Sequence, residues 1–574
     1  MSSRTVGWLD IGLATARLIP YVLTMTRCLP YLLELPTYMR GGLAAAVGDT
    51  ARRYPNRNAI WFNGTTTSWR ELDGLANQLA RQLQTLGVTR RTILGIHSSN
   101  RPEMLALITA ASRLGSTVAL FNTAQKGDAF HHSLSISRSE WLITEDVEAL
   151  PKSNIPYVSL TELLTSARVL PKTRVESPRI APSDAAFYIF TSGTTGFPKA
   201  SIMSHRRWIK AAFGYGCGML RLKPMDVLYN TLPLYHNLAT TIAWGSCVAT
   251  GACFALAESF SARRFWHDCR SSGATAISYI GELPRYLLAQ PPTKEDRLHS
   301  VRLATGVGLR HAIWDDFRER FGIKRVAEFY GSSEGNTVFL NLFGLDHTVG
   351  FSPTPHVLVE YDSTDGNPVS DAQGYMTPVA PNEQGLLLSR ITKRFPYDGY
   401  TDSHDSQKKL ITNPFGKGHT YVNTGDILRK IGCGHAVFVD RVGDTFRWKG
   451  ENVATLEVET VLDRFPTIQE SSVYGVNVPD VDGKPGMAAI VADAYTLDLD
   501  ALYAHCRAQL PEYAVPQYLR VHSKMALTQT FKHQRAATRD LGLRPVEGHT
   551  IFERTGDTPW SLRYEHLPRS QNTE

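Results

Sequence analysis

The chain has 574 residues, of which 43% are hydrophobic and 20% are charged. A single core stops growing at about 250–300 residues, so two or more domains are expected, and the composition is that of a globular protein rather than a disordered one. The formal net charge of +7 is scattered along the chain without long basic runs, which argues against a nucleic-acid partner.

The first 40 residues are apolar but interrupted. Residues 8–34 contain Asp10 and Glu34, and the apolar piece that follows Asp10 ends after six residues. We therefore expect neither a membrane span, which needs roughly 20 apolar residues, nor a secretory signal. Residues 1–40 form either a packed extension or an interfacial segment on a bilayer, and we favour the second. We expect an intracellular, peripheral location at the endoplasmic reticulum or peroxisome, although residues 571–574 are no peroxisomal tripeptide.

The seven cysteines are odd in number and form no Cys-x-x-Cys pair. This pattern is typical of buried, inert thiols in a reducing compartment. Neither a disulfide scaffold nor a structural zinc site is expected.

Helical and strand-like segments alternate from about residue 41. Residues 72–86 and 104–114 have the apolar spacing of helices, and residues 92–97 and 118–121 are strand-like. Strands separated by helices of this length predict βαβ crossovers and a largely parallel sheet. We therefore expect an α/β domain over residues 41–440.

The composition changes after a strand-like segment at 435–439. A charged, glycine-containing link follows at Asp440–Asp444. Beyond this link we expect helices at 456–465 and 499–510, and a strand at 472–476. Residues 441–574 are therefore predicted to form a small α+β domain on a hinge.

A strand-like run at 186–190 opens into a loop of hydroxyl, glycine and lysine residues. The loop contains Thr191, Ser192, Gly193, Thr194, Thr195, Gly196 and Lys199. Amides and hydroxyls donate hydrogen bonds to phosphate oxygens and a lysine supplies charge, so the loop is typical of a polyphosphate site. It is no Walker A loop, because Phe197-Pro198 separates its last glycine from its lysine.

The loop closely resembles that of the adenylate-forming (AMP-binding) superfamily, which contains acyl-CoA synthetases, luciferases and peptide-synthetase adenylation domains. Residues 279–286, 328–336 and 444–453 are similar to the fatty-acid-transport-protein and very-long-chain acyl-CoA synthetase branch. The resemblance covers about residues 45–535. It implies a large N-terminal adenylation domain of mixed, largely parallel sheets with helices, and a small, mobile C-terminal α+β lid domain.

The resemblance also implies roles for individual residues near the phosphates. Tyr330, which begins the segment Tyr330-Gly331-Ser332-Ser333, would lie against adenine. Ser333 would touch the α-phosphate or the substrate carboxylate. Glu334, with Thr194, would hold Mg²⁺, which takes hard oxygen ligands. His236 would border the carboxylate and Mg-ATP, and Gly308 belongs to a glycine segment that would lie along the adenine and the acyl tunnel.

Further positions follow from the resemblance at the ribose and in the lid. Asp426, after Thr424-Gly425, would accept hydrogen bonds from both ribose hydroxyls, and Arg441 would reach the same ribose or the phosphate. Lys532 matches the catalytic lysine of the C-terminal domain, although Gln529 stands where relatives often have glycine. Residues 331–335 also fit the Gly-x-Ser-x-Gly hydrolase elbow, but the strand-like sequence after them argues against it.

These assignments predict a two-step reaction that uses ATP, CoA and Mg²⁺. As a carboxylate attacks the α-phosphate, Lys199 and Mg²⁺ held by Glu334 would offset charge on the departing pyrophosphate, and Lys532 would bridge the carboxylate and the α-phosphate. The lid would then rotate, with a hinge near Gly443, and bring Arg447 and Lys449 to the site for attack by a thiol.

Three functions remain open at this point. The first is an acyl-CoA synthetase for a long or very long chain acid. The second is an adenylating enzyme of secondary metabolism that acts on a specialised acid or loads a carrier-protein thiol. The third is a membrane fatty-acid carrier, which only the apolar N-terminal segment supports.

Overall fold

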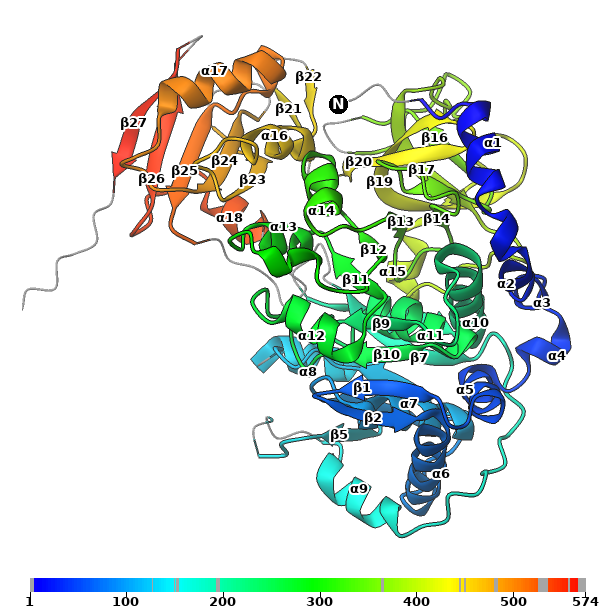
Figure 1. The fold of residues 1–574 in the computed structure, drawn as a ribbon. Helices are drawn as coiled ribbons and strands as arrows, with labels where there is room; N and C mark the ends of the chain where they lie inside the picture. Colours follow the sequence, from blue (N-terminus) through cyan, green and yellow to red (C-terminus); the bar gives the residue numbers. More distant parts are fainter. Residues whose placement is uncertain are drawn as a thin grey trace, which may run out of the picture.

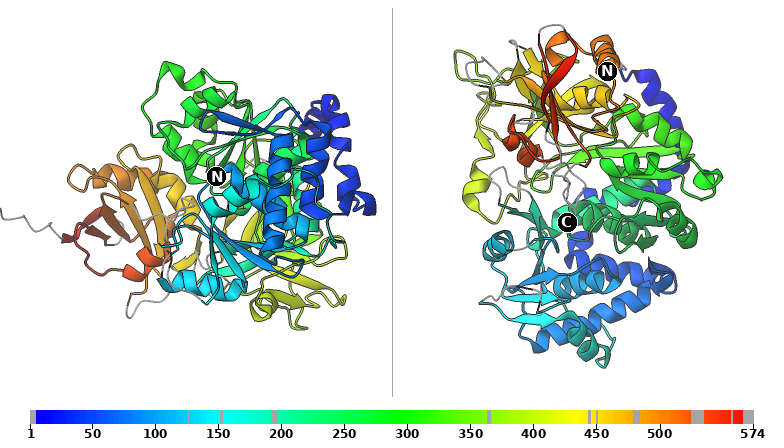
Figure 2. Two further views of the ribbon diagram at one scale, coloured as in Figure 1. Left: turned by 90° about the horizontal axis from the view of Figure 1, so that it is seen from below. Right: turned by 90° about the vertical axis from the view of Figure 1, so that its left-hand side faces the viewer.

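The computed structural model describes most of the chain, shown in Figure 1. The described residues are 5–125, 127–148, 150, 154–191, 197–362, 366–442, 445–448, 451–478, 484–524, 535–555 and 558–565. They build a large body with two sheets and a smaller domain with a sheet of its own. The smaller domain and the first helices lie on opposite sides of the large body (Figures 1 and 2).

The first sheet of the large body has six strands in the order β6-β5-β3-β4-β7-β8. They are β3 (Ile93–His97), β4 (Thr117–Leu120), β5 (Trp141–Thr144), β6 (Tyr157–Ser159), β7 (Ala185–Thr191) and β8 (Lys199–Ser204). All neighbours are parallel except β7 and β8. The associated helices are α6 (Trp69–Thr85), α7 (Pro102–Leu114), α8 (Gly127–Ser137) and α9 (Leu160–Arg168). The two helices and two strands predicted between residues 72 and 121 are therefore confirmed within a few residues.

The second sheet has 14 strands and changes character at β13. Its parallel part consists of β1 (Asn58–Phe62), β9 (Val227–Asn230), β10 (Cys253–Leu256), β11 (Ala276–Ile280), β12 (Leu303–Val307) and β13 (Arg325–Gly331). The antiparallel strands are β2 (Thr65–Ser68), β14 (Val338–Leu340), β15 (Gly350–Phe351), β16 (His356–Val359), β17 (Gln384–Arg390), β18 (Leu410–Thr412), β19 (Thr420–Gly432) and β20 (His435–Arg441). The predicted fold class, mixed and largely parallel α/β, is confirmed.

Helices pack on the second sheet and contribute to the core of the large body. They are α5 (Gly42–Arg53), α10 (His205–Phe213), α11 (Trp244–Thr250), α12 (Phe265–Ser272), α13 (Glu282–Leu288), α14 (Trp314–Arg320) and α15 (Ser403–Gln407), with short turns η2 (Gly214–Leu220), η3 (Leu238–Ala243), η4 (Lys294–Arg297) and η5 (His311–Ile313). Trp208, Trp244 and Trp314 of these helices are fully buried, as is Trp69 of α6. Burying each indole removes a large apolar area from water, which makes these four side chains major contributors to the core.

The thiols behave as the sequence predicts. All seven cysteines are free, and only Cys433 is not buried. Burial raises the pKa of Cys217, Cys253 and Cys506 to about 12, which keeps those thiols protonated and unreactive at neutral pH.

The N-terminal segment forms short helices along the outside of the large body (Figure 1). They are α1 (Trp8–Ala16), η1 (Ile19–Tyr21), α2 (Val22–Thr26), α3 (Leu29–Leu32) and α4 (Pro36–Met39). None of the helices in the described ranges combines the length and the hydropathy that crossing a membrane requires.

The lid, as we call the smaller domain, has a five-stranded sheet in the order β23-β24-β25-β26-β27. Its strands are β23 (Glu470–Gly475), β24 (Gly486–Val491), β25 (Tyr518–His522), β26 (Thr550–Arg554) and β27 (Trp560–Glu565), and a separate hairpin pairs β21 (Phe446–Trp448) with β22 (Glu451–Val453). The helices are α16 (Thr455–Leu462), α17 (Leu499–Gln509), η6 (Glu512–Ala514) and α18 (Arg535–Leu541). The lid has its own core around Val458, Leu502 and Leu519, so the predicted α+β architecture is confirmed.

Candidate active site

Three of the predicted site residues, together with Gly281, follow parallel strands of the second sheet at one edge. Strands β9, β11, β12 and β13 run parallel, so their carboxyl ends meet at the same edge. His236, Gly281, Gly308 and Glu334 each follow one of these strand ends within a few residues. Ligands of open α/β sheets bind at this edge, where loops can approach a substrate without disturbing the ladder.

The phosphate loop connects two antiparallel strands of the first sheet. Thr191, the last residue of β7, pairs with Lys199, the first residue of β8, and the Thr191 hydroxyl donates to the Lys199 carbonyl at 3.4 Å. The predicted binding residues Ser192, Gly193, Thr194, Thr195 and Gly196 lie outside the described residues. A strand and not a helix follows the loop, which separates it from a Walker A loop.

Lys199 has a partner that the sequence analysis missed. Its Nζ lies 2.6 Å from the Oδ1 of Asp405 in α15, and each side chain is 21% exposed. The Nζ also lies 5.7 Å from the centre of the Tyr400 ring. Asp405 is near because the Thr401 amide donates to Ala200 in β8 at 2.9 Å, which ties this segment to the strand. A partly exposed ion pair therefore holds the lysine at the start of β8.

Glu334 lies half-buried in the turn after β13. The turn is closed by the Gly335 amide, which donates to the Ser332 hydroxyl at 3.0 Å. Burial raises the pKa of the Tyr400 hydroxyl, and the Glu334 carboxylate, which accepts a hydrogen bond from it, adds to the rise. Glu334 and Lys199 therefore both adjoin Tyr400. Ser333 is half-buried in the same turn and Gly331 is exposed.

Arg207, in α10, is a second residue that the sequence analysis missed. Its Nη1 donates to the Ile202 carbonyl at 2.9 Å, its Nη2 lies 3.5 Å from the Ser332 carbonyl, and its Nε lies 3.9 Å from the Oδ2 of Asp398. Burial lowers the pKa of Arg207, and the Asp398 and Glu334 carboxylates oppose that effect. A cation in the first turn of a helix opposes the helix dipole, and that misplacement was a signal in the sequence.

Asp426 brings three predicted residues together. Its Oδ2 accepts a 2.6 Å hydrogen bond from the Tyr330 hydroxyl, and its Oδ1 lies 3.1 Å from the Arg441 Nε. The carboxylate is 3% exposed. Each oxygen retains a second lone pair, so the group can also accept from ribose hydroxyls. The Tyr330 ring packs among Phe339 and Phe438, with ring centres 5.7 and 6.2 Å away.

The glycine segment after β12 leaves little room for side chains. Gly308 has a φ of +83°, and a Cβ on Gly281 would lie 3.1 Å from the Gly308 carbonyl oxygen. Glu328, in the middle of β13, accepts a 2.6 Å hydrogen bond from the Leu309 amide. Burial raises the pKa of Glu328 to about 8. An acid inside an apolar strand was a sequence signal for this support, and the sequence analysis did not use it.

His236 lies half-buried just before the π-helical turn η3. Its Nδ1 accepts from the Leu238 amide at 3.2 Å, which fixes the ring in one orientation.

The segment after Glu334 tests the hydrolase alternative, because β14 turns back antiparallel to β13 with no helix between them. The hydrolase elbow, which requires that helix, is therefore excluded.

Several predicted residues fall in the hinge and in the lid. Lys532, Lys449, Gly443 and Asp444 lie outside the described residues, and only the backbone of Arg447, in β21, is described. No group of three or more His, Cys, Asp or Glu within the described ranges is arranged to hold a metal ion. A metal bound mainly by phosphate oxygens needs a single carboxylate such as Glu334, and the arrangement fits that type of site.

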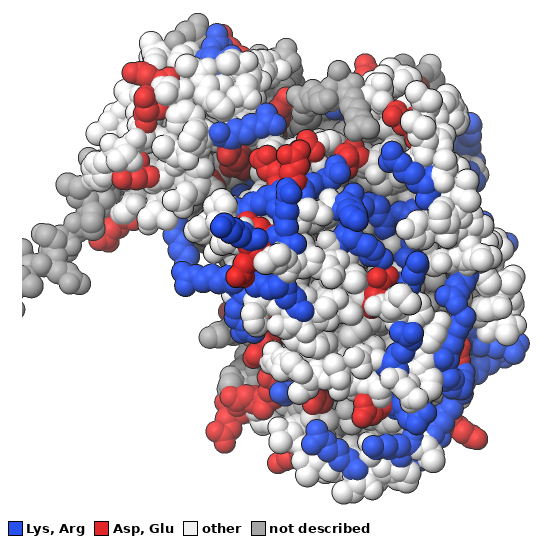
Figure 3. All heavy atoms as spheres, in the orientation of Figure 1, with Lys and Arg blue, Asp and Glu red and all other residues white. Residues whose placement is uncertain are grey.

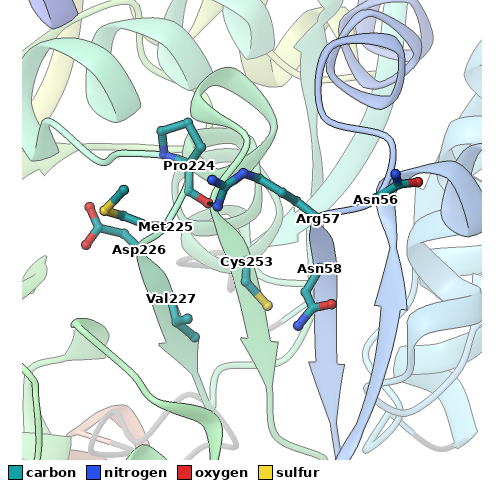
Figure 4. Close-up of a pocket in the computed structure, with 8 residues that line it drawn as sticks. All are labelled: Asn56, Arg57, Asn58, Pro224, Met225, Asp226, Val227 and Cys253. Atoms are coloured by element: carbon teal, nitrogen blue, oxygen red, sulfur yellow. Dashed lines mark hydrogen bonds between the residues drawn. The ribbon is translucent and has the colours of Figure 1, made fainter.

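A pocket of about 330 Å³ lies elsewhere, at the amino ends of β1, β9 and β10 (Figure 4). Arg57 reaches across it and donates from Nη1 to the Pro224 carbonyl at 3.1 Å. Asp226 and Cys253 also line it. Because the pocket is at the opposite edge from the phosphate loop, it is not part of the candidate active site.

The chain matches the family model described as AMP-binding enzyme over residues 47–388 and the AMP-binding enzyme C-terminal domain over residues 457–532. It is 42% identical over 550 residues to the medium/long-chain-fatty-acid–CoA ligase FadD6 of Mycobacterium tuberculosis, with 92% of both chains covered. It is 37% identical to the human long-chain fatty acid transport protein 1, covering 89% of this chain and 84% of that one.

Solved structures share the fold at lower identity. Two examples are ATP-bound MatB from Rhodopseudomonas palustris and the anthranilate CoA ligase AuaEII in complex with anthranoyl-AMP. Each has a TM-score of 0.74 and 19% identity, covering 87% of this chain and 98% and 97% of theirs, respectively.

Proposed function

The chain belongs to the AMP-binding enzyme family, and on that premise we propose that it is an AMP-forming acyl-CoA synthetase that converts a fatty acid through an acyl-adenylate. The observation that carries this proposal is the presence of two charge clusters, one beside the phosphate loop and one where β19 pairs with the last residue of β20. Lys199, Arg207 and Glu334 adjoin the phosphate loop, and Asp426 with Arg441 stands where a ribose would bind.

The substrate we propose is a long or very long chain acid. The names of the relatives at 42% and 37% identity refer to medium or long chain fatty acids, which supports an aliphatic substrate. The close approach of Gly281 to Gly308 leaves the end of β11 and β12 without side chains, and a flat or linear group fits beside such a surface.

The first half-reaction brings a carboxylate to a polyphosphate, so its barrier is largely electrostatic. Lys199 would leave Asp405 for a phosphate oxygen, and Lys532 would bridge the carboxylate and the α-phosphate. Arg207 would position the Glu334 carboxylate, because its Nη2 contacts the Ser332 carbonyl in the same turn. Mg²⁺ bound through Glu334, with Thr194, would neutralise charge on the departing pyrophosphate.

In the second half-reaction the thiol of CoA attacks the acyl carbon and AMP leaves. We place the domain limits at 41–440 for the adenylation domain and 441–574 for the lid, with residues 1–40 as a separate segment. The lid would rotate near Gly443, remove Lys532 and bring Arg447 and Lys449 close. Tyr330, by holding Asp426, would keep the ribose site intact through both steps.

The decisive test is the exchange of labelled pyrophosphate into ATP, measured with a panel of acids of increasing chain length. A carrier would support no exchange with any acid. Lys532→Ala should abolish exchange but spare thioester formation from a supplied acyl-adenylate, and normal exchange in that variant would contradict the lysine assignment. Comparing free CoA with a phosphopantetheinyl carrier protein distinguishes the synthetase from an enzyme that loads carriers.

We also propose that helices α1 to α4 bind a membrane surface. Ten of the nineteen exposed large hydrophobic side chains of the described residues lie within residues 8–38. They are Trp8, Leu9, Leu13, Ile19, Val22, Leu23, Leu29, Leu33, Leu35 and Tyr38. Such a concentration, with Arg17 and Arg27 interspersed, is typical of a segment that lies in the interface of an anionic bilayer. An endoplasmic reticulum or peroxisomal membrane remains our prediction for the location.

The opposite side of the same segment packs on the large body. The Tyr31 ring stacks on Phe213 with centres 3.3 Å apart, and Glu34 pairs with Lys210 at 2.9 Å and Arg206 at 3.3 Å. The two interpretations of the sequence therefore describe two sides of one segment. Because deletion would remove both, substitution of exposed side chains is the sharper test.

The variant Leu13→Ser/Leu23→Ser/Leu33→Ser changes exposed positions only and should reduce flotation with vesicles that contain about 30% anionic lipid. Each leucine contributes roughly 1.5–3 kcal/mol on full burial. The control is Val169→Ser/Tyr495→Ser, which removes exposed apolar groups from other surfaces. Equal flotation of the two variants would contradict this contact, whereas pyrophosphate exchange with a short soluble acid should persist in both.

A further inference from the structure

A buried cluster of charges joins the lid to the large body, and it includes none of the residues assigned above. Two arginines, Arg310 after β12 and Arg285 in α13, come from the large body. Four carboxylates surround them: Glu282, from the large body, and Glu459, Asp463 and Glu470, from the lid. Figure 3 shows acidic side chains gathered beside basic ones where the two domains meet.

Arg310 lies at the centre of this cluster. One Nη2 contact of 3.0 Å reaches Glu282 and another of 3.5 Å reaches Glu459, while Nη1 pairs with Asp463. The Arg310 side chain is 10% exposed, and the acids around it are 8% exposed or less. Arg310 therefore bridges one acid of its own domain and two acids of the lid.

Arg285 forms a second bridge next to the first. Its Nε lies 2.5 Å from Glu282, its Nη2 lies 3.1 Å from Glu470, and its Nη1 donates to the Gln469 carbonyl at 2.6 Å. Glu282 is thus shared by both arginines. The lid contributes a strand end, Gln469–Glu470, as well as the helix α16.

The acids of the lid are fixed within the lid. Glu459 accepts from the Val473 amide at 2.8 Å, and Asp463 accepts from the Ser471 hydroxyl at 2.6 Å. Four carboxylates face two guanidinium groups, so the cluster carries an excess of acids. Burial raises the pKa of Asp463. Arg310 opposes this rise, and the Glu459 and Glu282 carboxylates add to it. Such a cluster depends on its arginines, because removing one leaves several buried acids without compensation.

The strand register identifies which edge of the lid the cluster holds. Glu470 pairs with Val491, and Val491 pairs with His522, the last residue of β25. The chain that contains Lys532 leaves the sheet after His522. The hairpin of Arg447 lies at the other end, where Phe446 packs against Gly475 and Gly486. Glu470 and Gly475, at the two ends of β23, are five residue steps apart, or about 17 Å. Arg285 therefore contacts the end of the sheet from which the chain continues toward Lys532.

On the large body, the cluster continues the glycine segments of the site. Glu282 directly follows Gly281, and Arg310 follows Gly308 by two residues, with Leu309 held by Glu328. The arginine is therefore built on the same backbone that borders the proposed acyl-adenylate.

We propose that Arg310 is a positioning residue that holds the lid in the orientation used for adenylation, and that its contacts with Glu459 and Asp463 break before thioester formation. The two half-reactions are those of the proposed function, on which this proposal rests. The cluster places the end of the lid sheet at which β25 ends against the segments that follow β11 and β12, with Arg310 at the contact.

The test separates the half-reactions in Arg310→Gln, Arg310→Lys and Asp463→Asn. Arg310→Gln should lower pyrophosphate exchange at least about tenfold, because a buried bridge with several partners is lost. Thioester formation from a supplied acyl-adenylate should be unchanged or faster. Asp463→Asn should show the same separation to a smaller degree, and Arg310→Lys should restore part of the exchange.

The matched control is Arg320→Gln. Arg320 is 16% exposed and its Nε lies 2.7 Å from Asp296, but both residues belong to the large body. It should lower thermal stability without separating the two rates. If Arg310→Gln and Asp463→Asn lower both half-reactions equally, as a merely destabilised protein would, the positioning role is wrong.

Lid orientation gives a readout that does not require activity. Small-angle X-ray scattering of the apo protein should show a broader distribution of dimensions for Arg310→Gln than for wild type and for Arg320→Gln. Identical scattering of all three proteins would overturn the proposal even if the enzyme assignment holds. Absence of exchange in wild type with every acid would contradict the proposed function instead, and the scattering comparison would still decide the role of Arg310.

Discussion

Two clusters of charge in this molecule are built differently. At the phosphate loop, Lys199 and Asp405 form a 2.6 Å pair in which each side chain is 21% exposed. At the domain boundary, Arg310 is half as exposed and contacts three carboxylates. A cation that must change partner for a ligand has one exchangeable acid, whereas a cation that holds a domain in one of two orientations has several, because several contacts make release slower without making it impossible.

Arg207 is the strongest test of this distinction. It lies near the phosphate loop, as Lys199 does, but more than one carboxylate acts on it, as at Arg310. Replacing it with Met should remove the compensation for Asp398 and Glu334 and cost up to about 3–5 kcal/mol of stability. Pyrophosphate exchange should fall by a factor on the order of 10²–10³, as when a preorganised electrostatic group is lost. Denaturant unfolding and the exchange rate measure the two effects.

The matched control is its neighbour Arg206, which is 24% exposed and pairs with Glu34 of the N-terminal segment. Arg206→Met should change stability by less than about 1 kcal/mol, the usual value of such a pair. Similar losses in the two variants would show that Arg207 has no special place in the site.

Asp426 should give the next largest effect. Asp426→Asn keeps the shape of the side chain but removes its charge, so it weakens hydrogen bonds to ribose and to Arg441. Charged hydrogen bonds contribute about 1.5–3 kcal/mol each, which predicts ATP affinity reduced roughly 10- to 100-fold. Tyr330→Phe, which loses only the 2.6 Å bond from its hydroxyl, should cost about 1 kcal/mol. Unchanged ATP binding by Asp426→Asn in calorimetry would sink the ribose assignment.

Glu328 represents a third arrangement, a buried acid that faces backbone amides. Its pKa is raised to about 8, from an ordinary value of 4.5, by burial. The folded state therefore retains a proton that the unfolded state releases between those values. Its contribution to stability is fully present below the ordinary pKa and is lost as pH rises through about 8, by at most about 1.4 kcal/mol per unit.

The variant Glu328→Gln should accordingly flatten the decline in unfolding free energy between pH 5 and pH 8. The side-chain carbonyl of Gln still accepts from the Leu309 amide, so the fold should persist. Parallel pH profiles for the two proteins, measured by denaturant unfolding, would show that Glu328 does not titrate in this range.

The sequence was sufficient for local structure and for residues that belong to long motifs. The helix at α6 follows from apolar spacing and from a capping box between Ser68 and Glu71. The grouping of Tyr330, Asp426 and Arg441 was expected from resemblance, although the hydrogen bond from Tyr330 to Asp426 was not. Contacts between residues that are distant in the sequence could not be predicted. Arg310 and Asp463, for example, are 153 positions apart, and no local pattern connects them.

Asp405 should give the smallest effect, and in the opposite direction from the rest. Asp405→Asn removes the acid that competes with phosphate for Lys199, and a partly exposed pair of this kind contributes about 0–1 kcal/mol. The KM for ATP in pyrophosphate exchange should therefore fall by up to about fivefold, with little change in kcat. The control is Asp402→Asn, in the same segment, whose side chain accepts from the His404 amide at 2.7 Å and does not contact Lys199. Asn also caps helices well, so that variant should behave as wild type. A KM that rises in Asp405→Asn would mean that this carboxylate itself serves the nucleotide, and the contrast between one exchangeable partner and several fixed ones would then fail at the phosphate loop.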